Sequence, residues 1–181
     1  MHQKKENSDI KVMIARVGRC AKAVKGGRRF TFSVLAIAGD GKGKVGIGLG
    51  KAAEVADARD KADQNARKNI SKVYLRDSRT LHHDIETKFC SGRVKMRSAP
   101  AGTGVIAGGP LRALCEALGI KDVVIKSIGS TNPHNMVKAA LKGLKQIKSL
   151  RHIAEKRGKK VGDIIGVREK VASDSPEASL V

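Results

Sequence analysis

The sequence predicts an α+β protein in which strands precede helices twice along its 181 residues. Runs rich in Val, Ile, Phe and Thr over residues 10–24 and 30–38, and alternation over 45–50, are typical of strands. Apolar residues at three- and four-residue spacing over 52–73 predict a helix after these three strands. Predicted strands at 92–98 and 123–128, each followed by a helical pattern, indicate a second unit of the same class.

The first two predicted strands form a basic hairpin. Gly26 and Gly27, within the connecting segment KAVKGGRRF, can form a left-handed turn. No acidic residue lies between Asp9 and Asp40, and the same span carries Lys11, Arg16, Arg19, Lys22, Lys25, Arg28 and Arg29. We therefore expect the hairpin to contact a phosphate backbone, with an ordinary solvated loop as the alternative.

The stretch AGDGKGKVGIGLGKA, residues 38–52, resembles a nucleotide-binding loop but departs from both common patterns. Its GxGxxG match at Gly41, Gly43 and Gly46 runs into another strand, whereas a dinucleotide-binding loop opens a helix. No Gly-Lys pair is followed by Ser or Thr, as a Walker A loop requires. GDGKG is instead predicted to be a turn. The glycine face of VGIGLG is predicted to admit another backbone or an RNA strand.

The predicted helix over 52–73 has charged residues opposite its apolar stripe, and these are interpreted as a solvated face. Residues 75–84 show no periodicity and are predicted to be a linker. Within that segment His82, His83 and Asp84 lack further ligands at metal-binding spacing, so a solvated turn is expected there.

The strand GRVKMRS should present a basic outer face, because Arg93, Lys95 and Arg97 alternate with apolar residues. A second glycine cluster, AGTGVIAGGP, follows it and leads into a helix with Pro110 near its first turn. A nucleotide-dependent enzyme using Gly102–Gly109 is the rival hypothesis here. Against it, a dinucleotide-binding unit has an acidic residue at the end of the next strand, whereas Asp122 precedes that strand.

The last long helix follows STNP, where Ser130, Thr131 or Asn132 supplies the cap. Its apolar residues are expected to face inward. A basic edge is predicted on the opposite side, from Lys138, Lys142, Lys145 and Lys148.

The charge balance points to a polyanionic partner, since 37 Lys and Arg against 17 Asp and Glu give a formal net charge of +20. No apolar run approaches the roughly 20 residues of a membrane span, so nucleic acid is favoured over a membrane. The three cysteines lack CxxC spacing and are expected to be reduced thiols, and neither a metal nor another cofactor is predicted. With no Trp, one Tyr and three Phe, the chain lacks a base-stacking platform. Phe30 and Phe32 are expected in the core.

Four separated motifs resemble the bacterial family of the fifth protein of the small ribosomal subunit. They are VKGGRRFTFS, VGIGLGKAAEV, AGTGVIAGGPLRALCEALGI and GSTNPHNMVKA, in family order, and the resemblance covers about residues 10–165. It implies an N-terminal domain like a double-stranded-RNA-binding fold, with a three-stranded sheet and a helix, over residues 10–74. After the linker it implies a C-terminal β-α-β-α domain with a left-handed crossover over 85–165. Residues 1–9 and 166–181 are expected to be a flexible N-terminus and a disordered tail.

The resemblance also implies a function without enzymatic activity. Members of the family are cytoplasmic structural constituents of the ribosome that bind small-subunit ribosomal RNA where the head meets the body. They contact neighbouring ribosomal proteins four and eight, lie near messenger RNA at its entry channel, and support assembly and translational accuracy. A free-standing RNA chaperone that acts away from the ribosome is a further alternative.

Two sets of candidate site residues follow from these considerations. The RNA-binding set is Arg16, Arg19, Lys22, Lys25, Gly26, Gly27, Arg28, Arg29, Lys42, Lys44, Lys51, Arg93, Lys95 and Arg97. The protein-interface set, which the resemblance implies, is Gly102, Thr103, Gly104, Gly108 and Gly109. Ala21–Lys22–Ala23 departs from the family, which often has hydroxyl residues there, and the extended acidic-polar tail after Val167 is a second departure.

Overall fold

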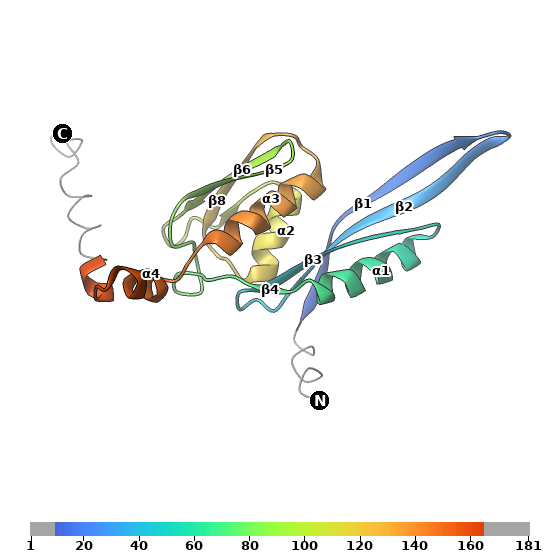
Figure 1. Cartoon of the computed structure of the whole chain (residues 1–181). Coiled ribbons are helices and arrows are strands. Elements are labelled where there is room, and N and C mark those ends of the chain that lie inside the picture. Colours follow the sequence, from blue (N-terminus) through green and yellow to red (C-terminus); the bar gives the residue numbers. More distant parts are fainter. Residues whose placement is uncertain (1–9, 165–181) are drawn as a thin grey trace, which may run out of the picture. The chain divides into compact units, whose positions relative to one another are not determined.

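The structure, a computed structural model, describes residues 10–164 and confirms the α+β class. The predicted flexible N-terminus and disordered tail lie outside the described residues. The chain divides into two compact units, residues 1–147 and 148–181, and each is described by itself. The first unit contains two four-stranded sheets with their helices (Figure 1).

The first sheet has the order β1 (Lys11–Val24), β2 (Gly27–Gly39), β3 (Lys44–Ala52) and β4 (Ser71–Lys72), all antiparallel. Helix α1 (Val55–Lys68) follows β3. The helix predicted over 52–73 is therefore too long, and the prediction of three strands misses β4. The helix ends at Asn69 because the next residues pair with the sheet: the Val73 N–H donates to the Gly43 carbonyl at 2.8 Å.

The glycine face of β3 is closed by the backbone of α1. A Cβ atom at Gly46, Gly48 or Gly50 would overlap the carbonyl oxygens of Ala66, Ala62 and Ala58, respectively. Only glycine lets a helix approach a strand so closely, and the three alanines keep the helix surface equally low. The sequence predicted that this face admits another backbone or an RNA strand, and the structure confirms another backbone, that of α1.

The other face of the first sheet packs against α2 (Gly109–Leu118). Leu35, Ile37 and Val45 join a hydrophobic core that also contains Leu114 and Leu118 of that helix. This core also includes side chains of the second sheet, so one apolar interior serves both sheets. The predicted division into domains 10–74 and 85–165 stays a prediction.

The turn between β2 and β3 is bonded to the end of α2. The Gly41 N–H donates to the Ala117 carbonyl at 3.0 Å, and the Gly43 N–H donates to the Leu118 carbonyl at 3.1 Å. The last carbonyls of a helix have no partner within the helix, so these two bonds complete α2. Asp40 shapes the turn by accepting bonds from the N–H groups of Lys42 and Lys44.

The second sheet has the order β5 (Ile85–Phe89), β6 (Gly92–Ser98), β8 (Val123–Gly129) and β7 (Val105–Ile106). Strand β7 runs parallel to β8 and the other pairs are antiparallel. Helix α3 (Pro133–Gln146) covers one face, where the Thr87 hydroxyl donates to the Ala139 carbonyl at 2.8 Å. Strands β5 and β7 were not predicted, and the left-handed crossover stays a prediction.

The segment predicted as a linker, residues 75–84, contributes to the core. Leu81 is 1% exposed, and Arg76 and Thr80 form an isolated antiparallel bridge. The segment is thus anchored by Leu81, with Leu75 packed against the same core, despite its lack of periodicity.

The second unit contains α4 (Leu150–Arg157), which starts at Ser149, whose hydroxyl accepts a bond from the His152 N–H at 3.3 Å. It ends at Gly158, which has a left-handed φ of 60°. In residues 10–164 no helix is long and apolar enough to cross a membrane.

The closeness of β3 and α1 predicts that Gly48→Ala destabilises the protein. Its Cβ would meet backbone atoms of Ala62 and Ala66, which cannot move without displacing the helix. We expect the free energy of unfolding, measured with urea, to fall by about 3 kcal/mol, the upper range for an overpacked core. Gly18→Ala is the control, because no atom lies within 4 Å of its added Cβ. Equal stability of the two variants would contradict the close packing.

Candidate RNA-binding surfaces

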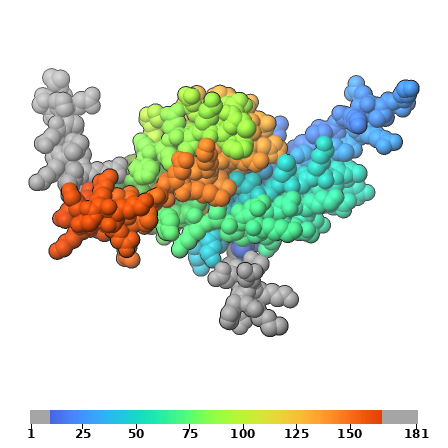
Figure 2. Space-filling model, viewed as in Figure 1, coloured from blue at the N-terminus to red at the C-terminus, as the bar shows by residue number. Residues whose placement is uncertain are grey.

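The first candidate surface is an arm formed by the far ends of β1 and β2. Strand β3 pairs with β2 only from Phe32 to Gly39, so the hairpin continues beyond it as two strands. We call residues 19–31 the basic arm. It extends away from the first sheet (Figure 1), and the space-filling view shows its blue tip projecting past β3 and α1 (Figure 2). Gly26 has a φ of 89° at its turn, which residues with a side chain rarely adopt.

The cations of the basic arm are exposed and unneutralised. Lys22, Lys25, Arg28 and Arg29 are all exposed, and within residues 10–164 none of them forms an ion pair. The arm contains no carboxylate. A surface of this kind attracts phosphate groups, because no internal charge competes for its cations.

Phe30 lies on the arm and not in the core, so that expectation was wrong. It is 45% exposed, and the Arg19 guanidinium lies 4.7 Å from its ring centre. The reason is that β2 leaves the sheet before Phe30, and no helix covers the arm. Phe32, two residues further along β2, packs against the buried alanines of α1, as expected.

The strand register gives the arm two distinct faces. Cross-strand partners point to the same side, so Lys22 and Arg29 share one face. Arg19 and Arg28 point to the other face, which continues into the side covered by α1.

Three other predicted residues lie around β3. Lys42 is exposed on the β2–β3 turn, and Lys44 is half-buried where β3 pairs with Lys72. Lys51 is exposed near the end of β3, opposite Ser33. Lys42 and Lys44 therefore lie at the end of the sheet away from the basic arm, whereas Lys51 lies beside the base of the arm, on the face of Lys22 and Arg29.

The second candidate surface is the uncovered face of the second sheet. Arg93, Lys95 and Arg97 point away from the core, where Val94 and Met96 are fully buried. Sequence reasoning missed Lys126, which pairs directly with Lys95 and is exposed. The position of Lys126 in the alternating pattern of VVIKSI could have placed it on this outer face. We call the four cations Arg93, Lys95, Arg97 and Lys126 the basic sheet face. It is partly neutralised, because Glu86 lies 3.6 Å from the Arg93 guanidinium.

The second glycine loop is organised by the buried Asp122. One carboxylate oxygen accepts bonds from the N–H groups of Gly102 and Gly104, both at 2.9 Å, and the other accepts from Arg79. The side chain of Asp122 is only 2% exposed. The Gly104 hydrogen bond, followed by Arg79, lowers the pKa of Asp122 from its ordinary value, so it stays charged.

This carboxylate occupies the place that a phosphate would need. A nucleotide loop binds phosphate through free backbone N–H groups. Gly102 and Gly104 already donate to Asp122, and Gly41 and Gly43 already donate to α2. The geometry therefore disfavours both nucleotide-loop hypotheses.

The residues predicted to form a protein interface lie in the loop that Asp122 holds and in the segment that leads from it to α2. Gly102, Gly108 and Gly109 are exposed with open space where a side chain would stand, and Thr103 is half-buried. Ile106 on β7 is 54% exposed beside them. An exposed apolar side chain among glycines is suited to contact with another protein. The interface assignment stays a prediction.

The titratable side chains elsewhere do not assemble a reactive centre. Over the described range 10–164, no group of three or more His, Cys, Asp or Glu could hold a metal ion. Burial lowers the pKa of His82 and raises that of the Cys115 thiol to about 12, so this thiol stays protonated.

Comparisons with known proteins cover almost the same residues. A family model described as "Ribosomal protein S5, N-terminal domain" matches residues 10–74, and one described as "Ribosomal protein S5, C-terminal domain" matches residues 87–157. Among curated relatives, small ribosomal subunit protein uS5 of Paramagnetospirillum magneticum is 52% identical over 94% of this chain and 81% of the relative. The proteins of that name from Ehrlichia ruminantium and Caulobacter vibrioides are 55% and 54% identical. These two alignments cover 88% and 97% of this chain and 91% and 87% of the relatives.

The role of Asp122 predicts a defined pH dependence of stability. Its pKa is lowered on folding, so its contribution is complete above the unfolded value of about 3.9 and disappears as the pH falls through the folded value. Asp122→Asn should therefore lower the melting temperature at neutral pH, and its difference from wild type should narrow below about pH 4. A difference that stays constant into acid, measured by circular dichroism, would contradict this role.

Proposed function

The chain belongs to the ribosomal protein S5 family, and we propose that it binds small-subunit ribosomal RNA through the basic arm and the basic sheet face. The membership confirms the resemblance seen in the motifs and makes the chain a structural constituent of the small subunit and not an enzyme. Its proposed place is the cytoplasmic ribosome, where the head of the small subunit meets the body.

The basic arm is the observation that carries this proposal. Its exposed cations have no carboxylate within the arm and form no ion pair in the part of the chain that the structure describes. A two-stranded hairpin without a covering layer is only marginally stable, so binding to a polyanion would also order it. Phosphate contacts by Lys and Arg suit recognition of structured RNA by shape.

The finer parts of the function rest on the family resemblance. We propose contacts with ribosomal proteins four and eight through the loop from Gly102 to Gly109, supported by its open glycines and the exposed Ile106. We also propose a position near messenger RNA at its entry channel, with roles in assembly and translational accuracy. The basic arm, which reaches beyond the sheet, is the element suited to such contacts.

Removing the arm's cations should impair incorporation into small subunits. Lys25→Ala, Arg28→Ala and Arg29→Ala together remove three exposed charges without touching the core. We expect less of this variant in small-subunit fractions of a sucrose gradient, with an unchanged melting temperature.

The matched control removes three exposed cations from α1, by Arg59→Ala, Lys61→Ala and Lys68→Ala. That helix also carries Asp57 and Asp60, so its surface charge is mixed. Normal incorporation of the arm variant, or equal loss in both variants, would contradict a specific role of the arm. Wild-type protein that remains at the top of the gradient would favour the chaperone alternative.

The affinity for isolated small-subunit ribosomal RNA should fall steeply with salt, because each neutralised phosphate releases counterions. The logarithm of the binding constant is expected to decrease linearly with the logarithm of salt concentration. The arm variant should lower that slope by about two to three, given about 0.7–0.9 for each of three lost phosphate contacts. A wild-type affinity that does not change with salt would contradict phosphate-based binding.

A further inference from the structure

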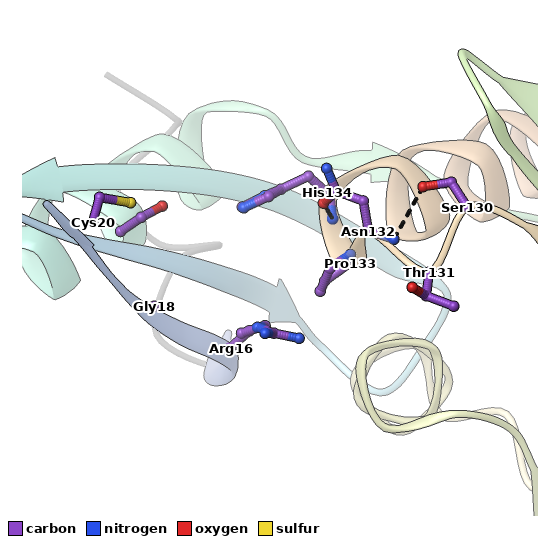
Figure 3. A pocket seen from close by; sticks show the side chains of 9 residues that line it. Arg16, Gly18, Cys20, Ser130, Thr131, Asn132, Pro133 and His134 are labelled. Carbon is purple, nitrogen blue, oxygen red and sulfur yellow. Dashed lines mark hydrogen bonds between the residues drawn. The ribbon is translucent and has the colours of Figure 1, made fainter. Parts of the chain in front are cut away.

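A groove lies between the first sheet and the start of α3, within the first unit. One wall is formed by Arg16, Gly18 and Cys20 of β1, and the other by residues from Ser130 to His134. Figure 3 shows Arg16 and Cys20 on the strand across from Thr131 and His134. The hollow has a volume of about 490 Å³ and is open to solvent.

The groove continues along α3 past this first hollow. A second hollow of about 240 Å³ shares His134 with the first, and a third of about 430 Å³ shares Lys138 with the second. Leu35 and Ile47 of the first sheet line the second hollow, and Lys145 lines the end of the third. The three hollows thus follow one another along α3, from the residues before its start to Lys145.

The groove is positively charged throughout. Arg16, Lys138 and Lys145 line it together with the uncharged His134, and no Asp or Glu does. Burial lowers the pKa of His134, and the positive charges of Lys138 and Arg16 lower it further because both lie near its ring. Within residues 10–164 Arg16 forms no ion pair. Cations held together without a counter-charge favour binding of an anionic ligand.

The groove also continues the cationic face of the basic arm. In the β1–β2 register, Arg16 pairs with Leu35, Gly18 with Ser33 and Cys20 with Thr31. The next pair on that same face is Lys22 with Arg29. One side of the hairpin therefore leads from the arm into the groove without interruption.

Hydroxyl and amide groups at the start of α3 add hydrogen-bonding capacity. Asn132 caps the helix by accepting a bond from the His134 N–H, and its own N–H donates to the Ser130 hydroxyl oxygen at 3.2 Å (Figure 3). The Ser130 hydroxyl proton stays available, as does the exposed hydroxyl of Thr131. Such groups contact phosphate and sugar oxygens in nucleic-acid complexes.

We propose that this groove binds a continuous stretch of ribosomal RNA backbone, which runs from Lys22 and Arg29 on the arm past Arg16 to Lys138 on α3. The proposal rests on the proposed function and names a binding path that the motifs do not mark. An acidic peptide would meet the same cations, but the path's continuity with the carboxylate-free arm favours RNA.

The test uses charge-neutral variants in the groove. Arg16→Gln and Lys138→Gln are compared with Lys121→Gln, whose lysine is exposed and lines none of the hollows. Binding to small-subunit ribosomal RNA transcribed in vitro is measured over a series of salt concentrations. Each groove variant should lower the salt slope by about one, and the double variant by about two. Lys121→Gln should leave it unchanged.

The protein's own thiols report whether RNA covers the junction of the groove and the basic arm, because Cys20 belongs to both. Cys20 lines the groove and is exposed, Cys90 is exposed in the β5–β6 turn, and Cys115 is buried. In the wild-type complex, RNA should slow alkylation of Cys20 by iodoacetamide relative to Cys90. Cys115 should stay unreactive and so report an intact fold.

The outcomes separate this proposal from the proposed function. Groove variants that behave like Lys121→Gln overturn the groove proposal and leave the arm's role intact, because Cys20 also lies at the base of the arm and its protection alone does not separate the two. Protection of Cys20 that requires a neighbouring ribosomal protein instead of RNA also overturns it. Wild-type protein without salt-dependent RNA binding overturns both.

Discussion

The fold depends on close contact between backbones, and glycine makes that contact possible. Gly46, Gly48 and Gly50 let α1 lie directly on β3, and Gly39 and Gly119 let the β2–β3 turn approach the end of α2. The first sheet is therefore held from both sides, by a helix packed on glycine and by a helix completed through hydrogen bonds. A side chain at these positions would separate the layers whose burial stabilises the protein.

The same contacts determine where an anion can bind. Backbone N–H groups that would grip a nucleotide phosphate instead donate to α2 or to the carboxylate of Asp122. Binding is left to side-chain cations, which are exposed on the basic arm and on the uncovered second sheet and which also line the groove beside α3. Glycine thus shapes the scaffold, and the exposed Lys and Arg side chains are left as the groups that can attract an anion.

Local patterns predicted much of this structure, and the rest depends on contacts between distant residues. A cap among Ser130, Thr131 and Asn132 follows from the local sequence, and the structure identifies Asn132 as the capping residue. The end of α1 does not follow from the local sequence. Ile70 and Val73 continue the helical spacing, although the chain already pairs with β3 there. Phe30 was placed in the core because its strand pattern does not reveal where the third strand ends. Short strands such as β7 carry almost no periodic signal.

The candidate surfaces show the same division. The cations of the arm were identifiable from an acid-free segment, whereas Lys138 and His134 come to line a groove only through the packing of α3 beside the first sheet. Backbone amide hydrogen exchange by NMR, with and without added ATP, tests the central claim about glycine most directly. The amides of Gly41, Gly43, Gly102 and Gly104 should be protected from exchange without any ligand, and ATP should leave their chemical shifts unchanged. The amide of Gly26 should exchange freely. Rapid exchange of the four amides, with shifts when ATP is added, would contradict it.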